Sequence, residues 1–476
     1  MTNRTKIVAT IGPASRQREV LRQLIEAGAD VFRLNFSHGT HEEHSATVAD
    51  IRAIGREMEC HVAILQDLCG PKMRLDPLPG DVLDCRLNEE FTLVDGAPAS
   101  AREFSCSYRA LPNDLRPGET VLFADGTVAM IVTNVTPGRA QMKVTLPGRL
   151  RSRQGLNLPG SNLAVSALTD KDRHDLDWTA RHSDDVDFVG LSFTRSPDDV
   201  LALRRELQSR HCPARIVVKI EKPHAVQRLE EIVAVTDAVM VARGDLGVEI
   251  DVERVPAIQK RIIALCNQAH RPVITATQML NSMEHSSRPT RAEASDVFNA
   301  VLDGTDAVML SGESAVGEYP VDAVSMMRRI CAEAEGYVNS KVRGAPGRRP
   351  PLGGLVEPIT EATVDAACLM AQQLNAGLIM VSTHTGRTAL ALSNRRPAAT
   401  ILALARDEPV ARRLSLCWGV MPVVFPAPMP AERLLTQGMD WAKSHALARS
   451  GDHAVLLGGR VADHPDIRAV VAGAIH

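Results

Sequence analysis

Aromatic residues are scarce in this chain of 476 residues, at 3% of the total. Any core must therefore be built mainly from Val, Ile, Leu, Ala and Met, which suits the close-packed layers of an α/β protein. The scarcity also argues against a protein that binds single-stranded nucleic acid by stacking bases on exposed aromatic side chains. With 45% hydrophobic and 23% charged residues, we expect an ordinary globular protein.

Paired cysteine motifs, charged runs and long apolar runs are also missing from the sequence. The nine cysteines contain no C-x-x-C pair, which favours reduced thiols in a cytoplasmic protein over a zinc site or a disulfide framework. The net charge is −3 and no basic run occurs, so neither nucleic acid nor a membrane is expected as a partner. There is no apolar signal core at the N-terminus and no segment long enough to span a bilayer.

Short runs rich in Val, Ile, Leu and Met recur along the first two thirds of the chain. Helical patterns follow several of them, at residues 19–27, 42–57 and 196–209. Eight β-then-α units predict a (β/α)8 TIM barrel, with an open doubly wound sheet as the alternative. The predicted strands are residues 6–10, 30–35, 61–66, 187–192, 215–220, 237–242, 272–277 and 306–310.

The regular spacing predicts three domains. The catalytic barrel is expected at residues 1–70 and 164–340. Residues 71–163 are rich in turn signals and predict an inserted small β-barrel domain, which could act as a lid over the barrel. A Pro-, Gly- and Arg-rich linker at 342–354 leads to a C-terminal α/β regulatory domain at 355–476, with strands near 378–382, 401–405 and 454–457.

Polar residues stand where the second predicted strand ends, and this is the rim at which barrel enzymes carry their active sites. Arg33, Asn35 and Ser37 alternate, so they share one face if the strand continues. A guanidinium group can bind phosphate or carboxylate through two parallel hydrogen bonds. The alternative for Arg33 is a structural ion pair.

The fifth, sixth and seventh predicted strands also end in polar residues. Glu221 and Asp245 on neighbouring strand ends could hold a hard cation such as Mg²⁺, which prefers a few carboxylates. The amides of Gly244 and Asp245 could open a helix and bind an anion. A salt bridge would explain either carboxylate alone, but Lys219 close by favours a functional site. Together these residues indicate a divalent-metal site that binds an anionic substrate.

Several long motifs in and around these strand ends resemble the pyruvate kinase family. The resemblance covers nearly the whole barrel and weakens in the insert and towards the C-terminus. The motifs are TKIVATIGPAS at 5–15, RLNFSHGTHEEH at 33–44, KIEKP at 219–223, MVARGDLGVEI at 240–250, ATQMLNSM at 276–283, RPTRAEASDVFNAVLDG at 288–304 and MLSGESAVGEYP at 309–320.

The resemblance implies transfer of a phosphoryl group from phosphoenolpyruvate to ADP, which gives pyruvate and ATP in glycolysis. It implies that Arg33 contacts the transferring phosphoryl group, that Lys219 offsets its charge, and that Glu221 and Asp245 bind Mg²⁺ or Mn²⁺. Gly244, Asp245 and Thr277 would hold the substrate carboxylate, with Thr277 also near the carbon that is protonated. The implied nucleotide-binding residues are Asn35, His38, Asp67 and Arg74, with Ser37 in the same region.

The sequence departs from the family pattern in the loop after the third strand. Many members have a threonine that helps to bind K⁺ and, four residues later, a glutamate; here these positions are Leu68 and Lys72. We predict that the Lys72 ammonium replaces the monovalent cation, so that K⁺ is not required. Gln154 stands where a basic residue usually precedes the GxNLPG motif, which leaves nucleotide contact from this stretch open.

The family resemblance also implies a homotetramer and an effector site for a phosphosugar or nucleotide in the C-terminal domain. Thr383, Thr385, Arg387 and Thr388 are the candidate effector residues, and a plain helix cap is the alternative. Residues 458–465 lack the loop common in relatives, so we expect altered or weak effector control. Two other functions stay open at this point, a metal-dependent lyase acting on pyruvate-like enolates and a non-catalytic metabolite sensor.

Overall fold

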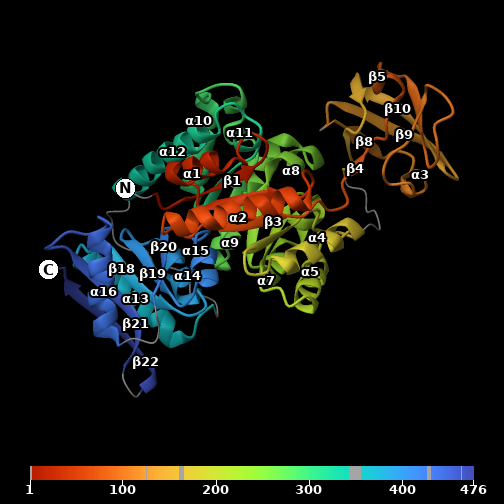
Figure 1. The fold of residues 1–476 in the computed structure, drawn as a ribbon. Helices are drawn as coiled ribbons and strands as arrows, with labels where there is room; N and C mark the ends of the chain where they lie inside the picture. The colour runs from red at the N-terminus through yellow and green to blue at the C-terminus, as the bar shows by residue number, and fades with distance from the viewer. Residues whose placement is uncertain are drawn as a thin grey trace.

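Eight parallel strands close into a barrel at the centre of the molecule (Figure 1). The structure is a computed structural model that describes residues 3–124, 126–159, 166–341, 355–425, 430–461 and 464–475. β1 pairs with both β2 and β17, so the sheet has no free edge, which confirms the TIM barrel and excludes the open sheet. The strands are β1 (Lys6–Ile11), β2 (Val31–Asn35), β3 (Ala63–Asp67), β13 (Phe188–Leu191), β14 (Arg215–Ile220), β15 (Ala238–Ala242), β16 (Val273–Ala276) and β17 (Ala307–Leu310).

Helices surround the barrel and pack their apolar faces on the outside of the strands. Thr40, Thr169 and Thr290 each begin a helix with a capping box, in which the side chain of the third helical residue bonds back to the cap. The main helices are α1 (Arg18–Ala27), α2 (His41–Glu57), α4 (Asp170–Arg181), α5 (Pro197–Ser209), α7 (Leu229–Val235), α9 (Val255–Gln268), α10 (Arg291–Asp303) and α12 (Pro320–Lys341).

Four aspartates repeat along the amino-terminal edge of the barrel, one directly before every second barrel strand in chain order, β2, β13, β15 and β17. The carboxylate of each accepts a hydrogen bond from an amide at the start of the preceding barrel strand, at 2.8–2.9 Å. The same hydrogen bond thus joins four pairs of neighbouring strands at the amino-terminal end of the barrel, which we call its floor. The pairs are Asp30 with Ile7, Asp187 with Ile64, Asp237 with Ile216, and Asp306 with Val273.

The C-terminal domain covers this floor. Arg412 donates to Asp187 at 2.9 Å, and Arg396 donates to Asp306 at 2.8 Å. Leu416, 1% exposed, follows α15 (Glu408–Leu414) and belongs to the cluster of apolar side chains that fills the barrel interior, with Val8 among its members. One end of the barrel core is therefore closed by a residue from another domain.

The C-terminal domain itself is a five-stranded sheet with helices on its faces. The sheet order is β20-β19-β18-β21-β22, and only β22 runs antiparallel to its neighbour. The predicted linker at 342–354 and residues 462–463 of the predicted chain-end loop lie outside the described residues. The elements are α13 (Pro358–Gln373), β18 (Leu378–Thr383), α14 (Arg387–Asn394), β19 (Thr400–Ala405), α15, β20 (Val420–Val424), α16 (Ala431–Ser444), β21 (His453–Val461) and β22 (His464–Ala474).

The insert between β3 and β13 forms a lobe with its own apolar core. Its seven-stranded sheet has the order β4-β12-β8-β9-β10-β6-β7, beside a two-stranded ribbon of β5 and β11. The entering and leaving segments pair with each other at its base, Arg74 opposite Gly155. Its elements are β4 (Met73–Arg74), η1 (Pro79–Asp81), β5 (Val82–Cys85), β6 (Glu90–Val94), β7 (Glu103–Phe104), α3 (Leu111–Asp114), β8 (Thr120–Phe123), β9 (Val128–Thr136), β10 (Arg139–Leu146), β11 (Gly148–Arg151) and β12 (Gly155–Asn157).

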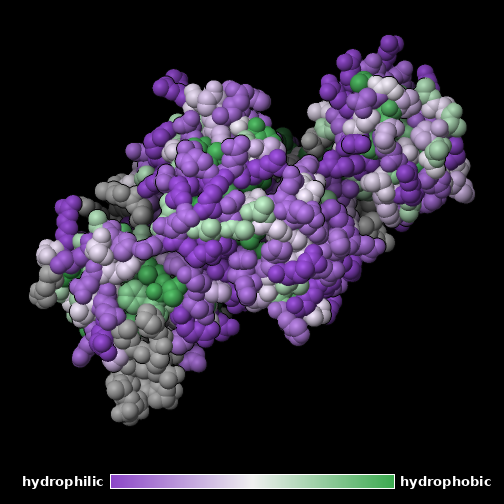
Figure 2. Space-filling view, in the orientation of Figure 1, coloured by the Kyte–Doolittle hydropathy of each residue, from purple (hydrophilic) through white to green (hydrophobic). Residues whose placement is uncertain are grey.

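Hydrophilic residues cover most of the face shown in Figure 2, and the insert stands out from the barrel as a separate lobe. The insert and the C-terminal domain lie at opposite ends of the barrel (Figure 1). Among the described residues, no helix is both long enough and apolar enough to cross a membrane.

Candidate active site

The predicted site residues gather at the carboxyl ends of the barrel strands, where two cationic side chains meet three carboxylates. Arg33 on β2 donates from Nε to Asp67 Oδ2 at 2.7 Å and from Nη1 to Thr10 Oγ1 at 3.1 Å. Asp67 ends β3 and is 1% exposed. Burial opposes its ionisation, but Lys219 and Arg33 outweigh this and hold the pKa of Asp67 below its usual value.

Lys219 on β14 lies between two carboxylates and a hydroxyl. Its Nζ is 2.8 Å from Glu221 Oε1, 2.8 Å from Ser192 Oγ and 3.4 Å from Asp67 Oδ2. Burial would favour the neutral amine, but Asp67 and Glu221 raise the pKa of Lys219, so the ammonium is retained. A permanent cation is thereby fixed at the rim of the barrel.

Glu221 is buried, with only 1% of its surface exposed. Its two carboxylate oxygens have different partners. Oε1 pairs with Lys219, and Oε2 accepts the amide of Phe193 at 2.8 Å. Burial raises the pKa of Glu221, Lys219 lowers it, and the negative charge of Asp245 raises it further. The two carboxylates are therefore close enough to repel each other, which a cation between them would relieve.

Asp245 lies in α8 (Arg243–Glu249), which begins where β15 ends. Within the described parts of the chain, its carboxylate makes no hydrogen bond or ion pair, so its oxygens are uncommitted. Nor do those parts contain a cluster of three or more His, Cys, Asp or Glu side chains arranged to hold a metal ion. Two carboxylates with the remaining positions left to water or substrate oxygens fit Mg²⁺ or Mn²⁺, so Glu221 and Asp245 suit the ion expected there.

Gly244 and Thr277 meet at the start of α8. The amide of Gly244 donates to Thr277 Oγ1 at 2.7 Å, and this hydroxyl lies 2.6 Å from the carbonyl oxygen of Ala276. Thr277 and Gln278 both have positive φ, 66° and 52°. A strained turn therefore carries the threonine hydroxyl to the start of α8.

The loop that follows β3 comes very close to Phe193. A Cβ at Gly70, whose φ is +65°, would lie 2.8 Å from the Phe193 ring and 3.1 Å from Ser192 Cβ. The position therefore requires glycine for space as well as for conformation. Phe193 itself has a φ of 55°, which aims its amide at Glu221.

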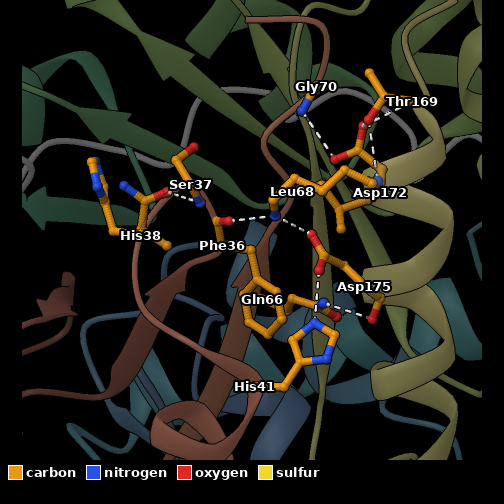
Figure 3. A network of polar contacts seen from close by, with 12 residues as sticks. Phe36, Ser37, His38, His41, Gln66, Leu68, Gly70, Thr169, Asp172 and Asp175 are labelled. Carbon is orange, nitrogen blue, oxygen red and sulfur yellow. Dashed lines mark hydrogen bonds and ion pairs between the residues drawn. The ribbon is translucent and has the colours of Figure 1, made fainter. Parts of the chain in front are cut away.

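A second layer of polar contacts holds the loops after β2 and β3 (Figure 3). Asp172 accepts from the amide of Gly70 at 3.1 Å and caps α4 together with Thr169. Asp175 accepts from His41 at 2.8 Å and, with its backbone oxygen, from Gln66 at 3.2 Å. α4 thus anchors both active-site loops.

The residues predicted to bind nucleotide are spread between the barrel rim and the insert, with Arg74 on β4 and Asp67 buried between Arg33 and Lys219. Asn35 Oδ1 accepts the amide of Ser37 at 3.1 Å. Burial lowers the pKa of His38, and the charges of Arg74, Lys72 and Arg33 lower it further. A cavity of about 380 Å³ lies near them, lined by Lys72, Arg74, Ala124, Thr127, Ser152, Arg153, Gln154 and Gly155.

The candidate effector residues lie at the opposite end of the molecule, where β18 leads into α14. Thr383 is buried, and its hydroxyl accepts the amide of Gly386 at 3.0 Å. Thr385 and Arg387 are exposed and Thr388 is partly exposed. The structure brings these four residues together at the start of α14.

Sequence reasoning missed several residues that hold the site. Thr10, Ser192 and Phe193 reach it from β1 and from the end of β13, and no local pattern marks them. The T-x-x-D spacing of Thr169 and Asp172 does predict a helix start, but not the bond to Gly70.

A closed barrel with a fixed ammonium, a guanidinium and two neighbouring carboxylates at its rim defines a class of metal-assisted enzymes acting on anionic substrates. Comparisons with known proteins point to one family. The family models for the pyruvate kinase barrel domain and the pyruvate kinase alpha/beta domain match residues 2–324 and 361–467. The chain therefore belongs to the pyruvate kinase family.

Individual relatives agree with this assignment. A pyruvate kinase of Sporosarcina psychrophila is 40% identical over 96% of this chain and 78% of its own length. One from Clostridium acetobutylicum is 39% identical over 96% of both chains. A crystal structure of a pyruvate kinase from Cryptosporidium parvum superposes with a TM-score of 0.88 at 36% identity, covering 99% of this chain and 96% of that one.

The chain is thus a phosphotransferase that transfers a phosphoryl group from phosphoenolpyruvate to ADP, giving pyruvate and ATP, and family members depend in general on Mg²⁺. The lyase and sensor alternatives are set aside.

Proposed function

We propose that the phosphoryl group is transferred between Arg33, Lys219 and a divalent ion held by Glu221 and Asp245. The observation that carries this proposal is the uncommitted Asp245 carboxylate close to the buried Glu221, because the negative charge of Asp245 raises the pKa of Glu221. The bound ion would supply positive charge where negative charge spreads over the transferring group. Because the ligand-free cluster has three carboxylates against two cations, a divalent ion would reverse its net sign and make it attractive to phosphate.

Arg33 and Lys219 would bind the phosphoryl oxygens from two strands. The longest contact of Lys219, 3.4 Å to Asp67, is the one that a phosphoryl oxygen would most readily replace. Breaking the P–O bond to phosphoenolpyruvate and forming one to the β-phosphate of ADP leaves an enolate, which takes up a proton at carbon. We place Thr277 beside that carbon, with the amides of Gly244 and Asp245 on the substrate carboxylate.

The nucleotide would lie between the barrel and the insert, at Asn35, His38, Asp67 and Arg74. Three basic residues, Lys72, Arg74 and Arg153, line the cavity of about 380 Å³ there. Arg153 would then supply the charge that Gln154 lacks. Closure of the insert over this cavity would keep water from accepting the phosphoryl group.

We also propose that K⁺ is not required. The Leu68 side chain is 2% exposed and offers no oxygen ligand, while its carbonyl accepts the Ser192 hydroxyl at 2.8 Å. The ammonium of Lys72 is one of the three charges that lower the pKa of His38, so it lies near this rim. The cytoplasmic location, the homotetramer and the effector site stay predictions from the sequence.

The proposal is tested by Glu221→Gln and Asp245→Asn in an assay that follows pyruvate from phosphoenolpyruvate, ADP and Mg²⁺. Each change should lower kcat about 1,000-fold, as expected for losing several kcal/mol of charge stabilisation. Binding of Mn²⁺, measured by electron paramagnetic resonance, should weaken in parallel. Asp251→Asn, at an exposed carboxylate just beyond α8, is the matched control. Tight Mn²⁺ binding and high activity in both site variants would refute the assignment of the metal ligands.

A further inference from the structure

The strained turn at Thr277 is held from outside by one guanidinium group. We infer that Arg243, itself fixed by Asp296, is a positioning residue that sets the place of the Thr277 hydroxyl in the active site. The inference rests on the role proposed for Thr277 and adds the residues that make this role attainable. Neither Arg243 nor Asp296 needs to touch the substrate for it to hold.

Thr277 and Gln278 are consecutive residues in the left-handed region, with φ values of 66° and 52°. Such a conformation is rare for a β-branched residue and persists only where the surroundings impose it. The turn directly follows β16, so it has no further partner strand to hold it. Some other group must keep the two residues in place.

Arg243 supplies that group. Its Nε donates to the Ala276 carbonyl at 3.1 Å, and its Nη2 donates to the Thr277 carbonyl at 2.7 Å. Both carbonyls flank the strained backbone, so the guanidinium fixes the direction of the turn. Nη2 also lies 2.7 Å from Met279 Sδ, two residues further on.

Asp296 holds the guanidinium from the other side. Its two carboxylate oxygens accept from Arg243 Nη1 at 2.8 Å and 2.6 Å. The arginine side chain is only 10% exposed, whereas that of Asp296 is 38% exposed. A planar group with five donors can serve the turn and the carboxylate together, which a lysine ammonium cannot do in the same geometry.

Arg243 is the first residue of α8, so it is directly joined in the chain to another residue that contacts Thr277. The next residue is Gly244, whose amide donates to Thr277 Oγ1 at 2.7 Å. Before substrate binds, the start of α8 therefore holds the turn twice, by a side chain at its carbonyls and by an amide at its hydroxyl; once the substrate carboxylate takes the Gly244 amide, Arg243 alone of these two holds it. Asp296 also gives a role to the polar motif at 288–304, because α10 begins there and places Asp296 beside the turn.

The test compares Arg243→Met, Arg243→Lys and Asp296→Asn with Thr277→Ala. Arg204→Met is the control, since Arg204 also forms a partly buried ion pair, with Asp237 at 3.1 Å, but at the far end of the barrel. We measure kcat, the KM for phosphoenolpyruvate and the solvent deuterium isotope effect on kcat. The isotope effect does not depend on how much of the protein is active, so a general loss of structure would leave it unchanged.

Arg243→Met should lower kcat by about tenfold to 100-fold, the usual effect of removing an outer-shell partner. The solvent isotope effect should rise as protonation of the enolate becomes slower, and it should rise equally in Thr277→Ala. Arg243→Lys should recover little activity, and Asp296→Asn should show the same changes in milder form. In Arg243→Met/Thr277→Ala, the losses should be far from multiplicative, because both changes remove one function.

Two results would overturn the inference. One is an Arg243→Met enzyme with the kcat and isotope effect of Arg204→Met; the other is a double variant whose losses multiply. If Arg243→Met does not fold, Asp296→Asn is judged by the same criteria. An unimpaired Thr277→Ala enzyme would instead show that the role proposed for Thr277 is wrong.

Discussion

At the scale of single residues, the site works through charges that keep one another ionised. Lys219 and Asp67 are both buried, and each shifts the pKa of the other towards the charged form. Glu221 is the exception, because burial and Asp245 raise its pKa. A cation bound between Glu221 and Asp245 would therefore relieve a repulsion that the cluster leaves uncompensated.

Lys72 gives a prediction that belongs to this scale. If its ammonium replaces the monovalent cation, the enzyme should keep its activity in tetramethylammonium buffer free of Na⁺ and K⁺. A tenfold loss there, on the order of 1.4 kcal/mol, would contradict this. Lys72→Met should lose activity in that buffer, whereas Lys143→Met, on β10 of the insert, should not.

The sequence identified the charged site residues but not all of their partners. Strand-end position marked Arg33, Lys219, Glu221 and Asp245. Ser192 could not be found this way, because its bond to Lys219 joins β13 to β14 across the barrel rim. Such contacts depend on the pairing and register of neighbouring strands, which a local pattern does not contain.

At the scale of secondary-structure elements, the barrel strands could be predicted because they are buried on both faces and are therefore nearly continuous apolar runs. The predicted strand at 215–220 agrees with β14, and the others differ at their ends by one or two residues. β20 was missed in the C-terminal domain. It is an edge strand that contains Pro422, and proline is tolerated there because no hydrogen bond is needed on the open side.

The segment after α15 supports a prediction at this scale. Leu416→Ala would leave a cavity at the floor of the barrel, so the free energy of unfolding should fall by about 2–5 kcal/mol. Urea unfolding of the purified protein measures this. Leu374→Ala, at the exposed leucine that follows the last residue of α13, should change it by less than about 0.5 kcal/mol. Equal losses in both variants would mean that Leu416 does not close the barrel core.

At the scale of the whole molecule, the active site and the candidate effector site lie at opposite ends of the barrel. Arg412 and Arg396 connect the C-terminal domain to the floor of the barrel, at the start of β13 and β17. β13 ends at the residues that hold Lys219 and Glu221. β13 therefore runs from a contact with the C-terminal domain at one end to the active site at the other.

The chain end bears on a prediction about effectors. Val461 pairs with His464, so only two residues connect β21 to β22, and the Thr383 hydroxyl already caps Gly386. We expect fructose 1,6-bisphosphate to change the half-saturating phosphoenolpyruvate concentration less than about threefold, which is under 0.7 kcal/mol. Titration of initial rates measures this. A large decrease would show that the short hairpin still permits effector control.

The four floor aspartates divide the barrel into consecutive quarters. Each of them ties a strand to the strand before it, so Asp187 belongs with β3, and Asp237 with β14. A break in the chain between β13 and β14, at residues 210–214, would separate no aspartate from its amide. Two co-expressed halves divided there would each carry complete quarters, and their reassembly would restore the strand pairing across the two seams and the contact of Arg412 with Asp187.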